Sequence, residues 1–137
     1  MSTPFGPQLI GETEKTLNAL LRRFLEATGL TEPQWVTLRL AGQLDGSVDS
    51  EGLVVGLAER AHFTNAADLV HELNARGLLD GGRLSSSGRE VTSALQARIA
   101  TETASIWHDL PDADVDSATR LLNEIVTRAR RVLASSM

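Results

Sequence analysis

Leu78-Leu79-Asp80-Gly81-Gly82-Arg83-Leu84-Ser85 is a strand–turn–strand pattern in a chain whose other segments favour helix. Its paired glycines are typical of a two-residue hairpin turn, because both can adopt positive φ. Two helices are expected directly before it, over residues 52–61 and 64–76, with only His62 and Phe63 between them. A tight pair of helices followed by a short hairpin predicts a winged helix-turn-helix.

Capping residues indicate where the helices begin and end. Thr31 and Gln34 have the spacing of a capping box, in which each side chain bonds to the backbone N–H of the other residue. Residues 87–90 repeat that spacing after the hairpin. Thr64 is expected to cap the second helix of the pair, and Gly77 to end it in a left-handed conformation. Helices are therefore expected over residues 7–28, 32–41, 52–61, 64–76, 88–108 and 112–134.

The last of these helices carries an apolar seam. Its members are spaced alternately three and four residues apart, which is a heptad pattern sustained over more than two repeats. The seam consists of Val115, Ala118, Leu122, Ile125, Ala129 and Val132, and is widened by Leu121, Val126 and Leu133. Such a face is wider than one partner helix needs. Two interpretations stay open, packing within the chain and packing against a second copy.

Length and composition limit the class of protein. The 137 residues suit a single domain, and 42% hydrophobic residues suit a packed core that is stable without disulfide or metal cross-links. Cysteine is absent, which excludes disulfides, thiolate metal sites and cysteine nucleophiles and is compatible with a reducing cytoplasm. No stretch approaches the ~20 apolar residues of a membrane span. Residues 1–8 lack the positive charge and apolar core of a signal peptide.

Other kinds of site find little support in the residues. Asp112-Ala113-Asp114 begins like a calcium loop, but the glycine and the bidentate carboxylate that such a loop requires do not follow it. His62, His71 and His108 have no metal-ligand spacing. No nucleophile elbow, phosphate-binding loop or dinucleotide fingerprint occurs. We therefore expect no metal, no cofactor and no enzymatic activity.

Several segments, taken together and in order, resemble the MarR family of bacterial transcription regulators. They span residues 9–133, and their joint order and spacing carry the likeness more than any single motif. The segments are Leu30–Leu40, Leu57–Arg60, Asp68–Leu78, Leu84–Arg89, and Leu110–Asp112 followed by Arg120–Leu122.

The resemblance implies a mainly α fold in which residues 1–137 form a single domain. A winged helix-turn-helix with a minimal hairpin would occupy residues 30–88, and helices over 9–28 and 89–134 would form a dimerisation layer. A homodimer of this kind places two recognition helices in successive major grooves of a palindromic DNA site. The resemblance also implies a cytoplasmic protein. In many such regulators, a small aromatic ligand between the dimer layer and the DNA-reading head releases the DNA.

The recognition helix implied by the resemblance is the one expected over 64–76. Thr64 and Asn65 at its start are chemically suited to read bases, and the carboxylate of Asp68 could accept from cytosine N4. Three arginines are expected at the phosphate backbone. The full set of expected DNA-binding residues is Thr64, Asn65, Asp68, Arg60, Arg76 and Arg83.

Charge and wing length argue against DNA binding. Residues 29–88 hold four basic and eight acidic residues, a net charge of −4 in a chain of −5, whereas affinity for duplex DNA comes largely from Lys and Arg. Asp80 and Arg83 flank only two glycines where members of the family carry a long wing. The alternative is a degenerate winged-helix protein that binds a protein partner or a small ligand in place of DNA.

Two tryptophans are the large aromatic anchors of the chain. In the simpler interpretation, Trp35 and Trp107 pack in the core. In the other, the resemblance places a ligand pocket near them, with Arg39 and His108 as polar partners for an anionic ligand. Both interpretations stay open.

Overall fold

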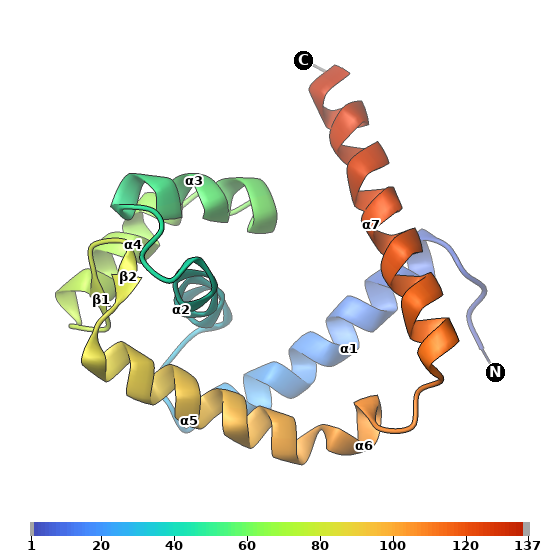
Figure 1. Cartoon of the computed structure of the whole chain (residues 1–137), viewed down its shortest axis with the longest axis horizontal. Helices are drawn as coiled ribbons and strands as arrows, with labels where there is room; N and C mark the ends of the chain where they lie inside the picture. Colours follow the sequence, from blue (N-terminus) through green and yellow to red (C-terminus); the bar gives the residue numbers. More distant parts are fainter. Residues whose placement is uncertain (1, 136–137) are drawn as a thin grey trace. The chain divides into compact units, whose positions relative to one another are not determined.

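The computed structural model describes residues 2–135 as a helical chain with one short hairpin (Figure 1). It divides into two compact units, one ending at Thr101 and the other beginning at Glu102. No helix in the described range is long and apolar enough to cross a membrane. The elements are α1 (Pro7–Leu25), α2 (Glu32–Leu44), α3 (Ser50–Ala61), α4 (Ala66–Ala75), β1 (Leu79–Asp80), β2 (Arg83–Leu84), α5 (Ser86–Glu102), α6 (Ala104–Trp107) and α7 (Asp112–Ser135).

Leucines of α2, α3 and α4 build the core of the first unit. Leu38 of α2, Leu53 and Leu57 of α3, and Leu73 of α4 are fully buried, and Trp35 is 2% exposed. Burial of each such side chain contributes about 1.5–3 kcal/mol relative to an exposed one. The core therefore fixes α4 firmly against α2 and α3.

Helix α2 begins as predicted and ends later. The backbone N–H of Gln34 donates to Thr31 Oγ1 (3.3 Å), and that of Thr31 donates to Gln34 Oε1 (2.9 Å), which confirms the capping box. The predicted end at residue 41 is wrong, because the helix continues to Leu44. Leu44 packs against the core, and this burial offsets the roughly 1 kcal/mol that Gly42 costs inside a helix.

Helix α4 is shorter than predicted at both ends. Asn65, not Thr64, occupies its N-cap position and makes no side-chain capping bond. The prediction that Thr64 caps the helix is therefore wrong, because Thr64 lies one residue before the position from which a side chain reaches the free N–H groups. Gly77 ends the helix as predicted, with φ 77°. The N–H of Leu78 then donates to the carbonyl of Leu73 (3.0 Å), which is the Schellman arrangement.

Strands β1 and β2 form the predicted two-residue hairpin. They pair antiparallel, with Leu79 opposite Leu84 and Asp80 opposite Arg83. Only the first glycine of the turn, Gly81, has positive φ (68°). This hairpin follows the α3–α4 pair directly along the chain, which confirms the predicted mainly α winged helix-turn-helix fold.

The turn of the hairpin lies against the α2–α3 loop and against α4. A Cβ on Gly82 would lie 2.5 Å from backbone atoms of Asp49 and Val48, so only glycine fits there. The N–H of Gly81 donates to Asn74 Oδ1 on α4 (3.0 Å). The β1–β2 hairpin, which is the short wing of this fold, is therefore held at its turn by the α2–α3 loop and by α4.

Helix α5 differs from its predicted course at both ends. Ser85 Oγ accepts from the backbone N–H of Gly88 (3.0 Å), so the cap predicted at Ser87 is instead made by Ser85. The predicted single helix over 88–108 is wrong, because Thr103 leaves helical geometry (φ −106°, ψ 7°) and separates α5 from α6. Threonine is a poor helix former, and a single polar β-branched residue is too weak a signal to predict such a break.

Arg98 joins α5 to the end of α1. Its Nη1 donates to the carbonyl of Phe24 (3.2 Å), and its guanidinium carbon lies 5.4 Å from the centre of the Phe24 ring. A cation at this place is favourable, because the last carbonyls of a helix have no partner within the helix. Helix α1 ends at Leu25, ahead of the predicted residue 28.

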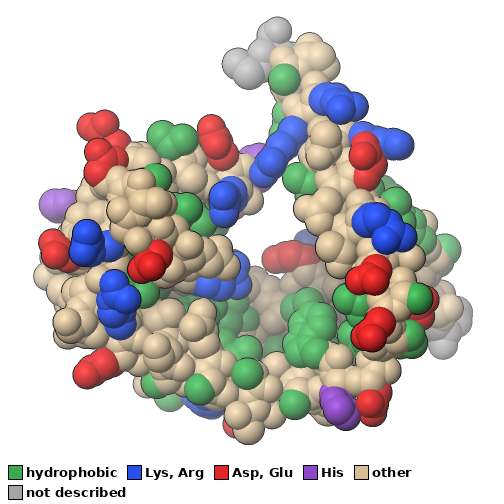
Figure 2. All heavy atoms as spheres, viewed as in Figure 1, with side chains coloured by type: hydrophobic (Ala, Val, Ile, Leu, Met, Phe, Trp, Pro, Cys, Tyr) green, Lys and Arg blue, Asp and Glu red, His purple; other side chains and the backbone are tan. Residues whose placement is uncertain are grey.

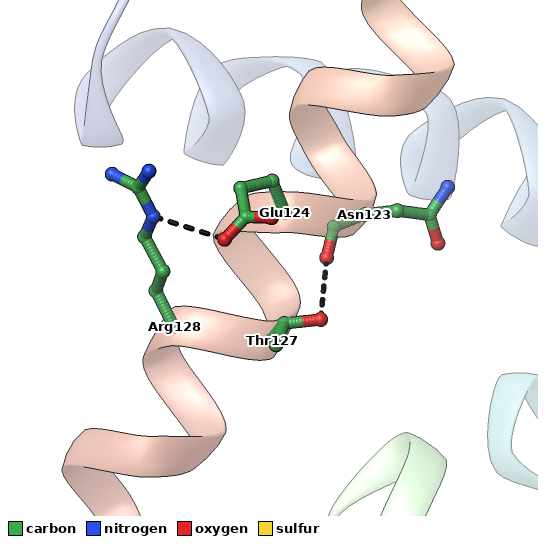
Figure 3. A network of polar contacts seen from close by, with 4 residues as sticks. All are labelled: Asn123, Glu124, Thr127 and Arg128. Atoms are coloured by element: carbon green, nitrogen blue, oxygen red, sulfur yellow. Dashed lines mark hydrogen bonds and ion pairs between the residues drawn. The ribbon is translucent and has the colours of Figure 1, made fainter.

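In the second unit, α7 is a long amphipathic helix without buried residues. On its polar face, Arg128 Nε donates to Glu124 Oε2 (3.1 Å) and Thr127 Oγ1 donates to the carbonyl of Asn123 (3.1 Å) (Figure 3). The predicted heptad seam lies on another face. Most of its larger members are exposed, from 42% at Val115 to 64% at Val132, whereas Ile125 is half-buried.

Candidate nucleic-acid interface

Helix α4 has one buried and one exposed face. An exposed helix face held on a firm core is the geometry that fits a major groove. The buried stripe is Ala66, Leu69, Val70 and Leu73. The exposed face carries Ala67, Asp68, His71 and Ala75.

Thr64 and Asn65 stand at the start of this exposed face. Both are exposed, and the side chain of Asn65 makes no capping bond to α4. An asparagine amide offers one donor and one acceptor, the pair needed for a bidentate contact to adenine. The structure thus places both predicted base-reading residues at the accessible N-terminus of the helix.

The two carboxylates of α4 have different surroundings. Asp68 is exposed on the outer face. Glu72 Oε1 instead accepts from Gln34 Nε2 of α2 (2.6 Å). Glu72 is exposed as well, but its carboxylate is bonded to a side chain of α2.

Gln34 also reaches Arg76 at the C-cap of α4. Arg76 Nη1 donates to Gln34 Oε1 (3.4 Å), the same oxygen that closes the capping box of α2. One buried glutamine side chain, 5% exposed, thus links the start of α2 to two residues near the end of α4. Sequence reasoning found its capping role and missed its bonds to α4.

The other two predicted phosphate contacts lie on different elements. Arg60 is exposed in the last turn of α3. Arg83 is exposed on β2, and a side chain added at Gly46 would touch its guanidinium (Nη2 at 3.5 Å). Arg83 therefore lies beside the α2–α3 loop.

Charge is mixed over the first unit. Figure 2 shows acidic and basic side chains interspersed on the face in view, without a continuous basic patch on that face. This agrees with the net charge of −4 over residues 29–88. Binding of DNA there would depend on a few well-placed arginines more than on a broad field.

Comparison with known proteins supports the fold. No protein-family model and no curated protein sequence matches the chain. Among solved structures, it is similar to the multiple antibiotic-resistance repressor (MarR) from Listeria monocytogenes 4b F2365, with 19% sequence identity and a TM-score of 0.50. The likeness covers 94% of this chain and 99% of that one. The chain has a MarR-like winged-helix fold.

Within the MarR-like fold, the four residues suggested for a ligand have unlike surroundings. Trp35 packs in the core of the first unit, as the simpler interpretation predicts. Arg39 of the same unit is exposed. In the second unit, Trp107 is 56% exposed, which contradicts the core interpretation for that residue. His108 there lies 3.2 Å from the carboxylate of Asp109.

Asn74 is a further residue that sequence reasoning missed. Its Oδ1 accepts from Gly81 and its Nδ2 donates to the carbonyl of Val70 (2.9 Å), so it holds the wing against α4. An asparagine in the last turn of a helix, shortly before a Gly-Gly hairpin, was the available signal. Among the residues described, no group of three or more metal-ligating side chains lies close enough to hold a metal ion.

Proposed function

We propose that this protein is a non-catalytic, sequence-specific transcription regulator that binds duplex DNA as a homodimer. The observation that carries the proposal is the exposed outer face of α4, held on a buried stripe and beginning with Thr64 and Asn65. In a MarR-like fold, this helix is the element suited to the major groove. Such a protein would work in the bacterial cytoplasm, where DNA is accessible.

Three kinds of contact follow from the placement of the residues. Thr64 and Asn65 read base edges, and Asp68 accepts from the N4 amino group of a cytosine. Phosphate contacts come from Arg60, Arg76 and Arg83. Because these cations are few, the affinity should fall only gradually as the salt concentration rises. The slope should correspond to about three phosphate contacts per protomer.

Self-association through α7 supplies the second winged helix-turn-helix that binding to a palindromic site requires. The three aspartates of α7 lie at its start, at positions 112, 114 and 116, and three of its arginines lie near its end, at 128, 130 and 131. Two copies paired antiparallel would bring acidic against basic segments and bury the heptad seam. This arrangement supports a two-fold homodimer and a palindromic site.

Binding of the protein to the DNA upstream of its own gene tests the proposal. Fluorescence anisotropy at two salt concentrations should show saturable binding that weakens at higher salt. Asn65→Ala should lower the affinity, whereas Asn123→Ala, on the polar face of α7, should leave it unchanged. A soundly folded dimer that fails to bind even at low salt would refute the proposal.

A second candidate is a degenerate winged-helix protein that binds a protein partner or small ligand. The acidic head, the exposed Asp68 and the wing fixed by Asn74 favour it. A response to a small aromatic ligand is compatible with either candidate function. Of the residues expected to contact such a ligand, Arg39 is exposed within the first unit, and Trp107 and His108 are exposed within the second.

A further inference from the structure

A polar pocket of about 340 Å³ lies between the second half of α2, strand β2 and the start of α5. All of its lining residues belong to the first unit. Each of the three elements contributes one arginine: Arg39 from α2, Arg83 from β2 and Arg89 from α5. Three arginines from separate segments therefore line the same pocket.

The charge of this pocket is opposite to that of its surroundings. Three arginines face one carboxylate, Asp45, in the lining, whereas residues 29–88 as a whole carry −4. Two of the four basic residues in that range, Arg39 and Arg83, are in this lining. An acidic protein that gathers arginines at one concave site creates a local attraction for anions.

Among the described residues, one of these arginines makes a loose ion pair. Arg89 Nη2 lies 3.8 Å from Asp45 Oδ1, with the two side chains 58% and 77% exposed. Exposed pairs of this kind contribute little stability, so exchanging Asp45 for another anion costs little. The pair shows that a carboxylate fits beside Arg89.

A buried polar atom adjoins the same site. Thr92 lines the pocket, and its Oγ1 is buried without a hydrogen-bond partner among the described residues. A hydroxyl in that state is costly unless something bonds to it. The neighbouring lining residues Ser93 and Gln96 add further polar groups, and no aromatic residue is among the lining residues.

We propose that this pocket binds a small, multiply charged oxyanion, such as a phosphate-bearing or polycarboxylate metabolite, which replaces Asp45 at Arg89. Guanidinium groups bind such oxyanions through paired, charge-assisted hydrogen bonds. Without an aromatic wall, the pocket is unsuited to stack the flat aromatic ligand considered above. If the protein binds DNA as proposed, occupancy also draws Arg83 away from the phosphate backbone and lowers the affinity for DNA.

Isothermal titration calorimetry on the full chain without DNA tests the binding itself. The probes are inorganic pyrophosphate and citrate, at constant ionic strength. We expect saturable binding of one anion per chain for at least one probe. The probe that binds more tightly indicates whether phosphate or carboxylate is the natural group. Absence of saturable binding for both would overturn the proposal, whatever the outcome of the DNA experiment.

Substitutions in the pocket should change the affinity for the anion in opposite directions. Arg39→Gln and Arg89→Gln should each weaken binding by about tenfold, whereas Asp45→Asn should strengthen it by removing the competing carboxylate. Arg120→Gln, at an exposed position of α7, removes the same charge outside the pocket and should leave binding unchanged. Circular dichroism confirms that each variant is folded. Equal affinity of Arg89→Gln, Arg39→Gln and Arg120→Gln would contradict the assignment.

Discussion

Gln34 Nε2 donates to Glu72 Oε1 across 2.6 Å and so joins the first turn of α2 to helix α4. The same glutamine closes the capping box with Thr31. Its side chain is buried and its bonds come from three different partners. Besides the leucine core, this single residue of α2 therefore helps to orient α4.

A double-mutant cycle on this pair should reveal the coupling. Gln34→Ala removes the capping bond and the bond to Glu72, and should lower the free energy of unfolding by about 1–2 kcal/mol. Glu72→Ala should cost less, and the interaction energy from urea unfolding of the single and double variants should be about 0.5–1 kcal/mol. Additive effects within error would show that the bond does not couple the helices.

Gly82→Ala tests the close packing of the wing on the α2–α3 loop. The added Cβ would lie 2.5 Å from backbone atoms of Asp49 and Val48, so we expect a loss of about 1–3 kcal/mol in thermal or urea unfolding. Gly11→Ala is the matched control, because nothing lies within 4 Å of its added Cβ in α1. That change should stabilise the protein by roughly 0.5–1 kcal/mol. Equal effects of the two changes would contradict the docked wing.

Short-range patterns predicted the parts of this fold that depend on neighbouring residues. The Thr31–Gln34 capping box, the Gly77 terminus and the Gly-Gly hairpin are all local, and all are present. Residue spacing also predicted most of the helices, with differences at their ends. These features need no knowledge of where distant segments lie.

Features that depend on distant partners were not predictable in the same way. The bond from Gln34 to Glu72 joins residues 38 positions apart. The extension of α2 to Leu44 depends on packing against the core, which outweighs the propensity of Gly42. Likewise, the pocket arginines come from three elements, and no sequence spacing brings them together.

Asp68→Asn should raise the affinity for DNA, because it removes an exposed negative charge from the outer face of α4 while its amide oxygen can still accept from cytosine N4. We expect an increase of about fivefold in the anisotropy titration, equal to about 1 kcal/mol. Glu72→Gln removes the same charge where Gln34 holds it against α2, so its effect should be clearly smaller. A larger gain for Glu72→Gln would place the DNA on another side of the helix.

Leu122→Glu should weaken self-association, because it places a charge in the centre of the α7 seam. Leu122 is 44% exposed in the single chain, so the change should leave the fold of one chain intact. Thr127→Glu adds the same charge on the polar face of α7 and should leave the dimer in place. Dissociation constants from sedimentation equilibrium compare the two, and similar values would exclude the seam as the interface.

The molecular mass in solution tests the central claim most directly. Sedimentation equilibrium on the wild-type protein at micromolar concentration should give twice the 14.7 kDa of one chain, and the Leu122→Glu variant should shift toward one chain. With a duplex that the protein binds, the added mass should correspond to two chains. A wild-type mass of 14.7 kDa at every concentration, or a single chain on each duplex, would contradict a dimer that places two recognition helices on one site.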